Sequence, residues 1–254
     1  MPSTSRLPLG DISPDQLNSF ARLSQASASF DPNERPLGFM RSATLGASTQ
    51  NDVMDAVCKN YTLLFARGTT EEGNMGTLVG PPLAQALGKA VGADNIAVQG
   101  VDYAASVEGF LAGGDADGSK TMAGLVAMAR SNCGNTSLIL GGYSQGAQLV
   151  HKAADMLTAN ETAFVMSAVL FGDPDNGKAV GQIEKSRTKV FCHDGDKICD
   201  GQALVDQAHL TYSLNVGEAT AFALKAKVVE ALASHLSKED ETREESEKVM
   251  KPSR

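Results

Sequence analysis

One stretch of the chain has the residue types and the spacing of a nucleophilic site. Residues 137–149 are SLILGGYSQGAQL, in which Ser144 stands between Gly142 and Gly146. An apolar run, a glycine-rich corner and a helical pattern, in that order, are typical of a nucleophile elbow, which holds a serine on a sharp turn between a strand and a helix. Glycines suit such a turn because a Cβ would clash where the strand and the helix approach closely. The motif alone is weak in a chain with 25 glycines, and a glycine-rich turn in a parallel sheet is the alternative.

A serine nucleophile needs an imidazole to accept its proton, and a carboxylate to hold that imidazole. In this arrangement the acid and then the histidine follow the serine in the chain, and the sequence has four histidines. The pattern around His151 predicts that it faces solvent on its helix. His193 leaves no room for an acid between the preceding strand and itself, and His235 lies close to a charged tail. His209, in the loop-like segment DQAHLTY, is therefore the predicted base.

The predicted partner of that base is Asp196, in the segment CHDGDKIC. Cys192 and Cys199 bracket this residue, and a bridge between them would close a small, stiff loop around the carboxylate. Asp194 and Asp200 are alternatives on sequence grounds.

An oxyanion hole would complete the set. One donor is expected to be the backbone N–H of Gln145, directly after the serine, and another is expected from a loop after an early strand. The loop RGTTEEGN contains Thr69, which could offer both its N–H and its hydroxyl. The alternative is a polar turn that binds nothing.

Alternating strands and helices must position these residues. Because most of the expected strands are apolar runs without polar alternation, they predict a parallel sheet with helices on both faces. Strands are expected at 61–66, 96–101, 137–141, 163–171 and from 189 to 192, and helices at 78–91, 119–131, 145–157 and 217–236.

Three regions differ in composition. Residues 1–55 are rich in Ser, Pro, Asn and Asp, which predicts an extension outside the core: a flexible arm, a pro-segment or a cover over the site. Residues 56–236 form the predicted α/β domain. Residues 237–254 are of mixed charge with almost nothing to bury, which favours a solvated helix or a disordered tail.

Composition excludes several classes of function. The net charge of −8 argues against nucleic acid or an anionic membrane as the main partner, and no apolar run is long enough to span a bilayer. The four cysteines contain no C-x-x-C pair, so two disulfides in an oxidising compartment are expected rather than a zinc site. Sequons at Asn60, Asn135 and Asn160 fit secretion. Residues 1–17 lack the apolar core of a signal peptide, so we expect a mature or recombinant chain whose leader has been removed.

Three separated motifs resemble those of the fungal cutinases, which are secreted serine esterases of the α/β-hydrolase superfamily. They are ARGTTEEGNMGTL at 66–78, GGYSQG at 141–146, and VFCHDGDKIC at 190–199 followed by HLTY at 209–212. The resemblance implies a three-layer α/β/α sandwich with a central five-stranded parallel sheet. It also implies a largely uncovered active site that hydrolyses cutin and soluble short-chain esters.

Residue by residue, the resemblance implies the following roles. The nucleophile, base and orienting acid would be Ser144, His209 and Asp196; the oxyanion donors Thr69 and Gln145; the substrate-binding positions Val205, Leu210 and Tyr143; and the disulfides Cys58–Cys133 and Cys192–Cys199. No metal or organic cofactor is expected, and the chain is expected to act as a monomer. One departure concerns an Asn that some cutinases use to support the oxyanion hydroxyl, because the corresponding segment FLAGGDADG has none.

The sequence therefore predicts a secreted carboxylesterase acting on cutin and on short-to-medium-chain esters through an acyl-enzyme. Two alternatives remain: an esterase that deacetylates xylan, and a secreted surface-binding protein that keeps the fold without catalysis.

Overall fold

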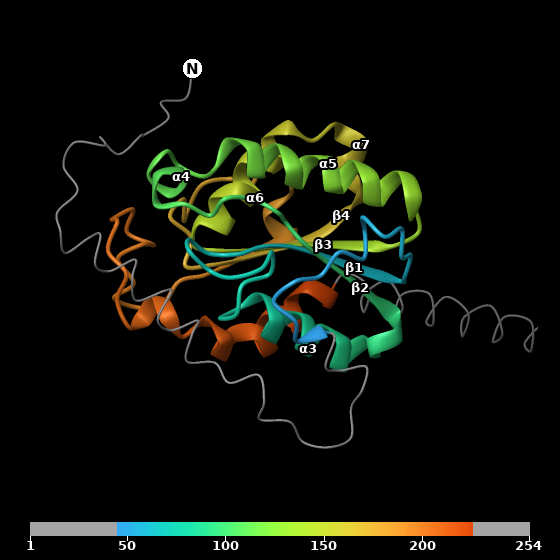
Figure 1. Ribbon diagram of the computed structural model, residues 1–254, viewed down its shortest axis with the longest axis horizontal. Coiled ribbons are helices and arrows are strands. Elements are labelled where there is room, and N and C mark those ends of the chain that lie inside the picture. The colour runs from blue at the N-terminus through green and yellow to red at the C-terminus, as the bar shows by residue number, and fades with distance from the viewer. Residues whose placement is uncertain (1–44, 226–254) are drawn as a thin grey trace, which may run out of the picture.

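The computed structural model describes residues 45–225, which are built around one sheet of five parallel strands. The spatial order of the strands is β2-β1-β3-β4-β5. This confirms the predicted fold class, a three-layer α/β/α sandwich (Figure 1). The strands are β1 (Tyr61–Ala66), β2 (Ile96–Gly100), β3 (Ser137–Tyr143), β4 (Val165–Phe171) and β5 (Thr188–Phe191).

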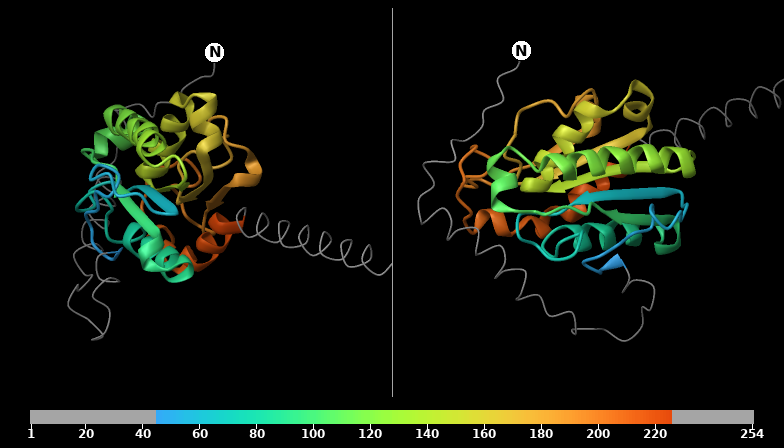
Figure 2. Two further views of the ribbon diagram at one scale, coloured as in Figure 1. Left: turned by 90° about the vertical axis from the view of Figure 1, so that its right-hand side faces the viewer. Right: turned by 45° about the horizontal axis from the view of Figure 1, so that its top comes forward.

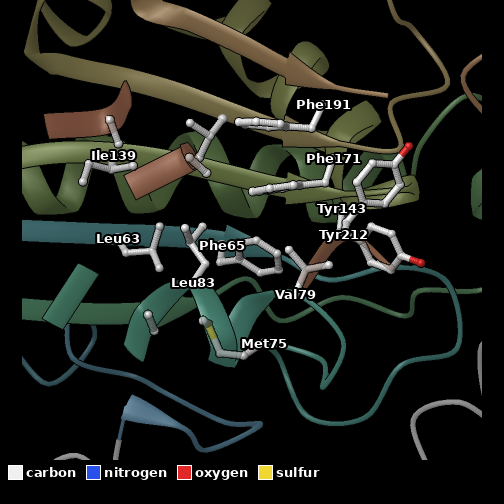
Figure 3. Close-up of a cluster of buried hydrophobic side chains, with 14 of the residues drawn as sticks. Leu63, Phe65, Met75, Val79, Leu83, Ile139, Tyr143, Phe171, Phe191 and Tyr212 are labelled. Carbon is white, nitrogen blue, oxygen red and sulfur yellow. The ribbon is translucent and has the colours of Figure 1, made fainter. Parts of the chain in front are cut away.

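The strands are mostly apolar because both faces of the sheet are covered. Successive strand side chains point to opposite faces, so Leu63 and Phe65 of β1 belong to one buried cluster and Leu64 and Ala66 to another. Helices α5 (Ala116–Asn132) and α6 (Gln145–Met156) cover one face (Figure 2). Helix α3 (Gly80–Val91) and the helical residues 216–225 cover the other, whose core side chains are drawn in Figure 3.

Side-chain caps explain where two helices differ from the prediction. The carboxylate of Asp115 accepts the Gly118 N–H, so α5 begins at residue 116 rather than 119. A capping box between Thr158 and Glu161 starts a short helix, so part of the strand expected from residue 163 is helical. The remaining short elements are α4 (Val107–Leu111), α7 (Ala159–Phe164), η1 (Ala93–Asn95), η2 (Lys185–Arg187), η3 (Ala208–Leu210) and η4 (Tyr212–Asn215).

Residues 45–55, which the sequence assigned to the extension, pack against the sheet. Asn51 forms an antiparallel bridge with Gln99 of β2. The side-chain oxygen of Gln99 accepts the backbone N–H groups of Val53 and Met54. Leu45 and Val53 are buried. The rest of the expected extension, the last part of the predicted 217–236 helix, His235 and the 237–254 tail lie outside the described residues.

Two disulfides tie the domain together, as expected. Cys58 is bonded to Cys133, and Cys192 to Cys199, and the described part of the chain holds no free cysteine. No helix within residues 45–225 has the length and apolar character to cross a membrane.

The strand order places a switch point between β1 and β3. From β1 the chain moves to β2 on one side, and then returns to β3 on the other side. Loops leaving the carboxyl ends of β1 and β3 therefore diverge, and ligands of open α/β sheets commonly bind at such a point. Thr69 follows β1 and Ser144 follows β3, so the fold brings both predicted site residues to this point.

Candidate active site

Ser144 lies on a strained turn between β3 and α6. Its backbone has φ 55° and ψ −119°, a conformation that costs free energy for a residue with a side chain. The glycines around it are sterically required: a Cβ on Gly142 would lie 2.5 Å from the Gly146 carbonyl oxygen, and one on Gly146 would lie 1.9 Å from the Ala66 carbonyl oxygen. The helix thus packs directly against β1, which confirms the close approach inferred from the sequence.

His209 and Asp196 form a buried pair. Nδ1 of His209 lies 2.8 Å from Oδ2 of Asp196, and both side chains have no exposed surface. Because a carboxylate only accepts, the hydrogen resides on Nδ1, and Nε2 of the neutral imidazole keeps a lone pair. That tautomer is the one a general base requires.

Asp196 is held ionised by the hydrogen-bond donors around it. Burial raises its pKa, but hydrogen bonds from His209, Tyr212 and the backbone N–H of Ile198 outweigh burial, so the pKa is lowered. The alternative acids, Asp194 and Asp200, are both exposed. Of the three, the structure brings only Asp196 to the histidine.

The imidazole lies beside the serine turn, although the two side chains do not hydrogen-bond. The ring of His209 stacks on that of Tyr143 at 5.1 Å, and a Cβ on Gly172 would lie 2.5 Å from its Cε1 atom. Ser144 is tied to the same strand end, since its N–H donates to the Phe171 carbonyl. The Ser144 Oγ and His209 Nε2 atoms are both buried, with no partner within residues 45–225. Unpaired buried polar atoms are uncommon in proteins and call for an explanation, and a hydroxyl oxygen and an imidazole nitrogen are the atom types that a nucleophile and its general base require.

The predicted oxyanion residues are in contact. Nε2 of Gln145 donates to the Thr69 hydroxyl at 2.9 Å and to the Ser106 carbonyl at 2.8 Å. The Thr69 oxygen therefore accepts a hydrogen from the amide, and its own hydrogen is free to turn toward a ligand. The side chain of Gln145 thus supports this hydroxyl in a chain that lacks the Asn expected from the family pattern.

Glu71 holds the Thr69 loop in place, a role that the sequence analysis missed. Its carboxylate accepts three backbone N–H groups: Gly68 at 2.7 Å, and Thr77 and Leu78 both at 2.9 Å. Burial raises the pKa of Glu71, against the opposing effect of these donors and of the Arg67 cation. The sequence holds two adjacent acids in this loop, Glu71 and Glu72, and no local signal tells which of them accepts the backbone N–H groups.

The three predicted substrate-binding residues lie in different surroundings. Val205 is fully buried and Leu210 is half-buried, both on the side of the sheet that packs against α3. Tyr143 is also buried, and its hydroxyl donates to the His209 carbonyl at 2.9 Å, so its side chain contacts the histidine segment. The structure departs from the expectation of an uncovered site, because Ser144 and His209 have no exposed surface.

The prediction that His151 faces solvent is wrong. His151 is 6% exposed, and its Nε2 atom lies 2.9 Å from Oδ2 of Asp173, which is fully buried. Its Nδ1 atom lies 3.0 Å from the Ala179 carbonyl. The loop after β4 covers this face of α6, and its position was not evident from helical periodicity. Within residues 45–225, no group of His, Cys, Asp or Glu side chains is arranged to hold a metal ion.

Comparison with known proteins identifies the family. The family model described as Cutinase matches residues 57–227. The chain belongs to the cutinase family. A cutinase from Botryotinia fuckeliana is 49% identical over 180 residues, which cover 71% of this chain and 89% of that protein. The structure of Trichoderma reesei cutinase with a phosphonate inhibitor matches with a TM-score of 0.69 and 38% identity, over 84% of this chain and 92% of that one.

This cutinase-family chain is a serine ester hydrolase. More distant neighbours share its fold. The catalytic core domain of an acetyl xylan esterase from Trichoderma reesei matches with a TM-score of 0.53 over 66% of this chain and 98% of its own, at 22% identity. At that identity, the likeness shows the architecture alone.

Proposed function

We propose that this chain is a secreted carboxylesterase that hydrolyses cutin and short-to-medium-chain esters through an acyl-enzyme formed on Ser144. The observation that carries the proposal is the buried His209–Asp196 pair next to a serine on a strained turn. The family relationship supports ester hydrolysis, and the named cutinases support cutin as the substrate. The two disulfides support an extracellular site of action.

In the first half of the reaction, the Ser144 hydroxyl attacks the ester carbonyl carbon. His209 accepts the serine proton at Nε2 and becomes an imidazolium, which the Asp196 carboxylate stabilises across its Nδ1 hydrogen bond. The Thr69 hydroxyl and the Gln145 N–H donate to the oxyanion of the tetrahedral intermediate. His209 then returns its proton to the departing alcohol, leaving the acyl group on Ser144.

In the second half, water attacks the acyl carbon and His209 again accepts a proton. The acid product leaves and Ser144 regains its hydrogen. No metal or organic cofactor takes part, and one chain holds every group named. We place the acyl chain against the half-buried side chain of Leu210. The other two predicted substrate-binding residues, Val205 and Tyr143, are buried. Because Ser144 is fully buried, the surrounding groups must move to admit a substrate.

Covalent labelling tests the proposal directly. A fluorescent alkyl phosphonate should label the native chain once, and p-nitrophenyl butyrate should be hydrolysed. Ser144→Ala should abolish the labelling and reduce kcat at least ten-thousandfold, by about the factor known for serine hydrolases that lose their nucleophile. Ser137→Ala, at the start of β3, is a matched serine control that should keep both. A Ser144→Ala variant that retains activity would exclude the proposed nucleophile.

Substrate comparison separates the two esterase alternatives. Release of hydroxy fatty acids from cutin, together with turnover of butyrate esters and little action on acetylated xylan, is the expected pattern. Preferential release of acetate from xylan would favour the deacetylase. A chain that neither labels nor hydrolyses any ester would favour a surface-binding protein.

A further inference from the structure

Tyr212 belongs to the same buried network as the His209–Asp196 pair. Its hydroxyl oxygen lies 2.6 Å from Oδ2 of Asp196, and its side chain is fully buried. The backbone N–H of His193 donates to the same hydroxyl at 2.9 Å. Figure 3 shows the Tyr212 ring beside that of Tyr143, and their centroids are 6.2 Å apart.

These contacts determine which way the tyrosine hydrogen points. A backbone N–H can only donate, so the Tyr212 oxygen accepts from His193 and its own hydrogen is directed at Asp196. The same carboxylate oxygen, Oδ2, also accepts the Nδ1 hydrogen of His209 at 2.8 Å. Two donors therefore share one oxygen, while Oδ1 accepts the Ile198 N–H at 3.0 Å.

From this geometry we infer that Tyr212 is a positioning residue that acts through Asp196 on the proposed base. Its hydroxyl holds the carboxylate in the orientation that His209 needs. It also draws negative charge from Oδ2, which limits how strongly the carboxylate stabilises the imidazolium. The inference rests on the proposed function, in which His209 transfers the proton.

Tyr212 can serve this way because it stays neutral. Burial, followed by the hydrogen bond to Asp196, raises its pKa far above the usual value. Other ionisable groups also face the network. The carboxylate of Asp206 accepts the backbone N–H of His209 at 3.1 Å, and the His193 ring stacks on Tyr212 at 4.1 Å. Tyr143, at the end of β3, stacks on His209, and burial followed by the charge of Glu71, in the loop after β1, raises the pKa of Tyr143.

Tyr212→Phe tests the inference, because it removes one oxygen and keeps the ring. With less charge drawn from Oδ2, the imidazolium form of His209 becomes more stable, so the acidic limb of the kcat/KM profile should move up by about one pH unit. The plateau value of kcat should fall by about tenfold, because the carboxylate is less firmly held. Tyr61→Phe, at the opposite end of the sheet, is the matched control and should change neither.

A double-variant comparison shows whether Tyr212 acts through the carboxylate. In an Asp196→Asn background, the phosphonate labelling rate should be the same with Tyr212 or Phe at this position. If Tyr212→Phe slows labelling equally in both backgrounds, the residue acts by another route and the inference is wrong.

Two further outcomes are decisive. An unchanged acidic limb, with any loss of kcat matched by a lower melting temperature, would mean that Tyr212 only fills space. This failure is distinct from failure of the proposed function, which would appear as activity retained in Ser144→Ala with the native tyrosine in place.

Discussion

The side-chain amide of Gln145 donates to the Thr69 hydroxyl at 2.9 Å, and both side chains are fully buried. This bond links the residue after the serine to the loop after β1, so the two proposed oxyanion donors form one hydrogen-bonded unit. The amide gives its second hydrogen to the Ser106 carbonyl, which fixes its orientation.

Removing the Thr69 hydroxyl should impair the chemical step. We expect Thr69→Ala to lower kcat by about a hundredfold with little change in KM, because the oxyanion exists only in the transition state and the intermediate. Steady-state kinetics on p-nitrophenyl butyrate checks this. Thr70→Ala, at an exposed neighbouring position, should leave kcat unchanged. A rise in KM alone would mean that Thr69 contacts the substrate but not the oxyanion.

Neutralising the Asp196 carboxylate should lower kcat more than removing the Thr69 hydroxyl does. Asp196→Asn places an amide against Nδ1 and favours the wrong tautomer of His209, so kcat should fall by about ten-thousandfold. The matched control is Asp200→Asn, at an exposed acid in the same loop. Equal activity of the two variants would contradict the assignment of the acid.

Glu71→Gln tests how the loop that carries Thr69 is held in place. The glutamine amide would face at least one backbone N–H as a second donor, so the loop should lose one of its three bonds. We expect kcat to fall by about tenfold and the free energy of unfolding by about 2 kcal/mol. Glu72→Gln, next to it and exposed, is the control and should change neither. A loss of stability with unchanged kcat would limit Glu71 to folding.

The His151–Asp173 pair should make stability depend on pH. Burial lowers the pKa of His151, but the hydrogen bond and charge of Asp173 outweigh it, so the pKa is raised above 6.5 in the folded chain. The pair's contribution is therefore fully present below pH 6.5 and is lost as the pH rises through the folded-state pKa.

Urea unfolding between pH 6 and 9 measures this. His151→Gln should lose about 3 kcal/mol at pH 6 and less at pH 9. Asp173→Asn should lower the free energy of unfolding by a similar amount, with the same dependence on pH. The double variant should lose little more stability than either single variant. Parallel pH profiles for the native chain and His151→Gln would refute the linkage.

The two disulfides should differ in what they stabilise. Cys58–Cys133 spans 75 residues and Cys192–Cys199 spans 7, so loop-closure entropy predicts stabilisation of about 4.5 and 2.5 kcal/mol. Replacing the first pair by serine should mainly lower the melting temperature. Replacing the second should also lower kcat, because Asp196 lies inside that loop. If the first replacement has the larger effect on kcat, the small loop does not hold the acid.

The sequence by itself determined the five strands and the tight turn at Ser144. Apolar runs such as 137–141 predict buried parallel strands because helices cover both faces of the sheet. Gly142 and Gly146 predict a close approach because only glycine fits there. Local patterns of this kind suffice where the physical cause is local. Side-chain caps are also local, yet the Asp115 cap was missed, because the surrounding glycines and aspartates resemble a loop.

Only the tertiary structure decided what distant segments do to one another. Helical periodicity placed His151 toward solvent, but the loop carrying Asp173 covers that face. Likewise, the sequence favoured Asp196 but left Asp194 and Asp200 as alternatives, and only the fold shows that Asp196 is the acid that contacts His209. The roles inferred for Glu71 and Tyr212 also depend on hydrogen bonds that folding assembles. Burial and partner choice are properties of the packed chain, so no window of sequence contains them.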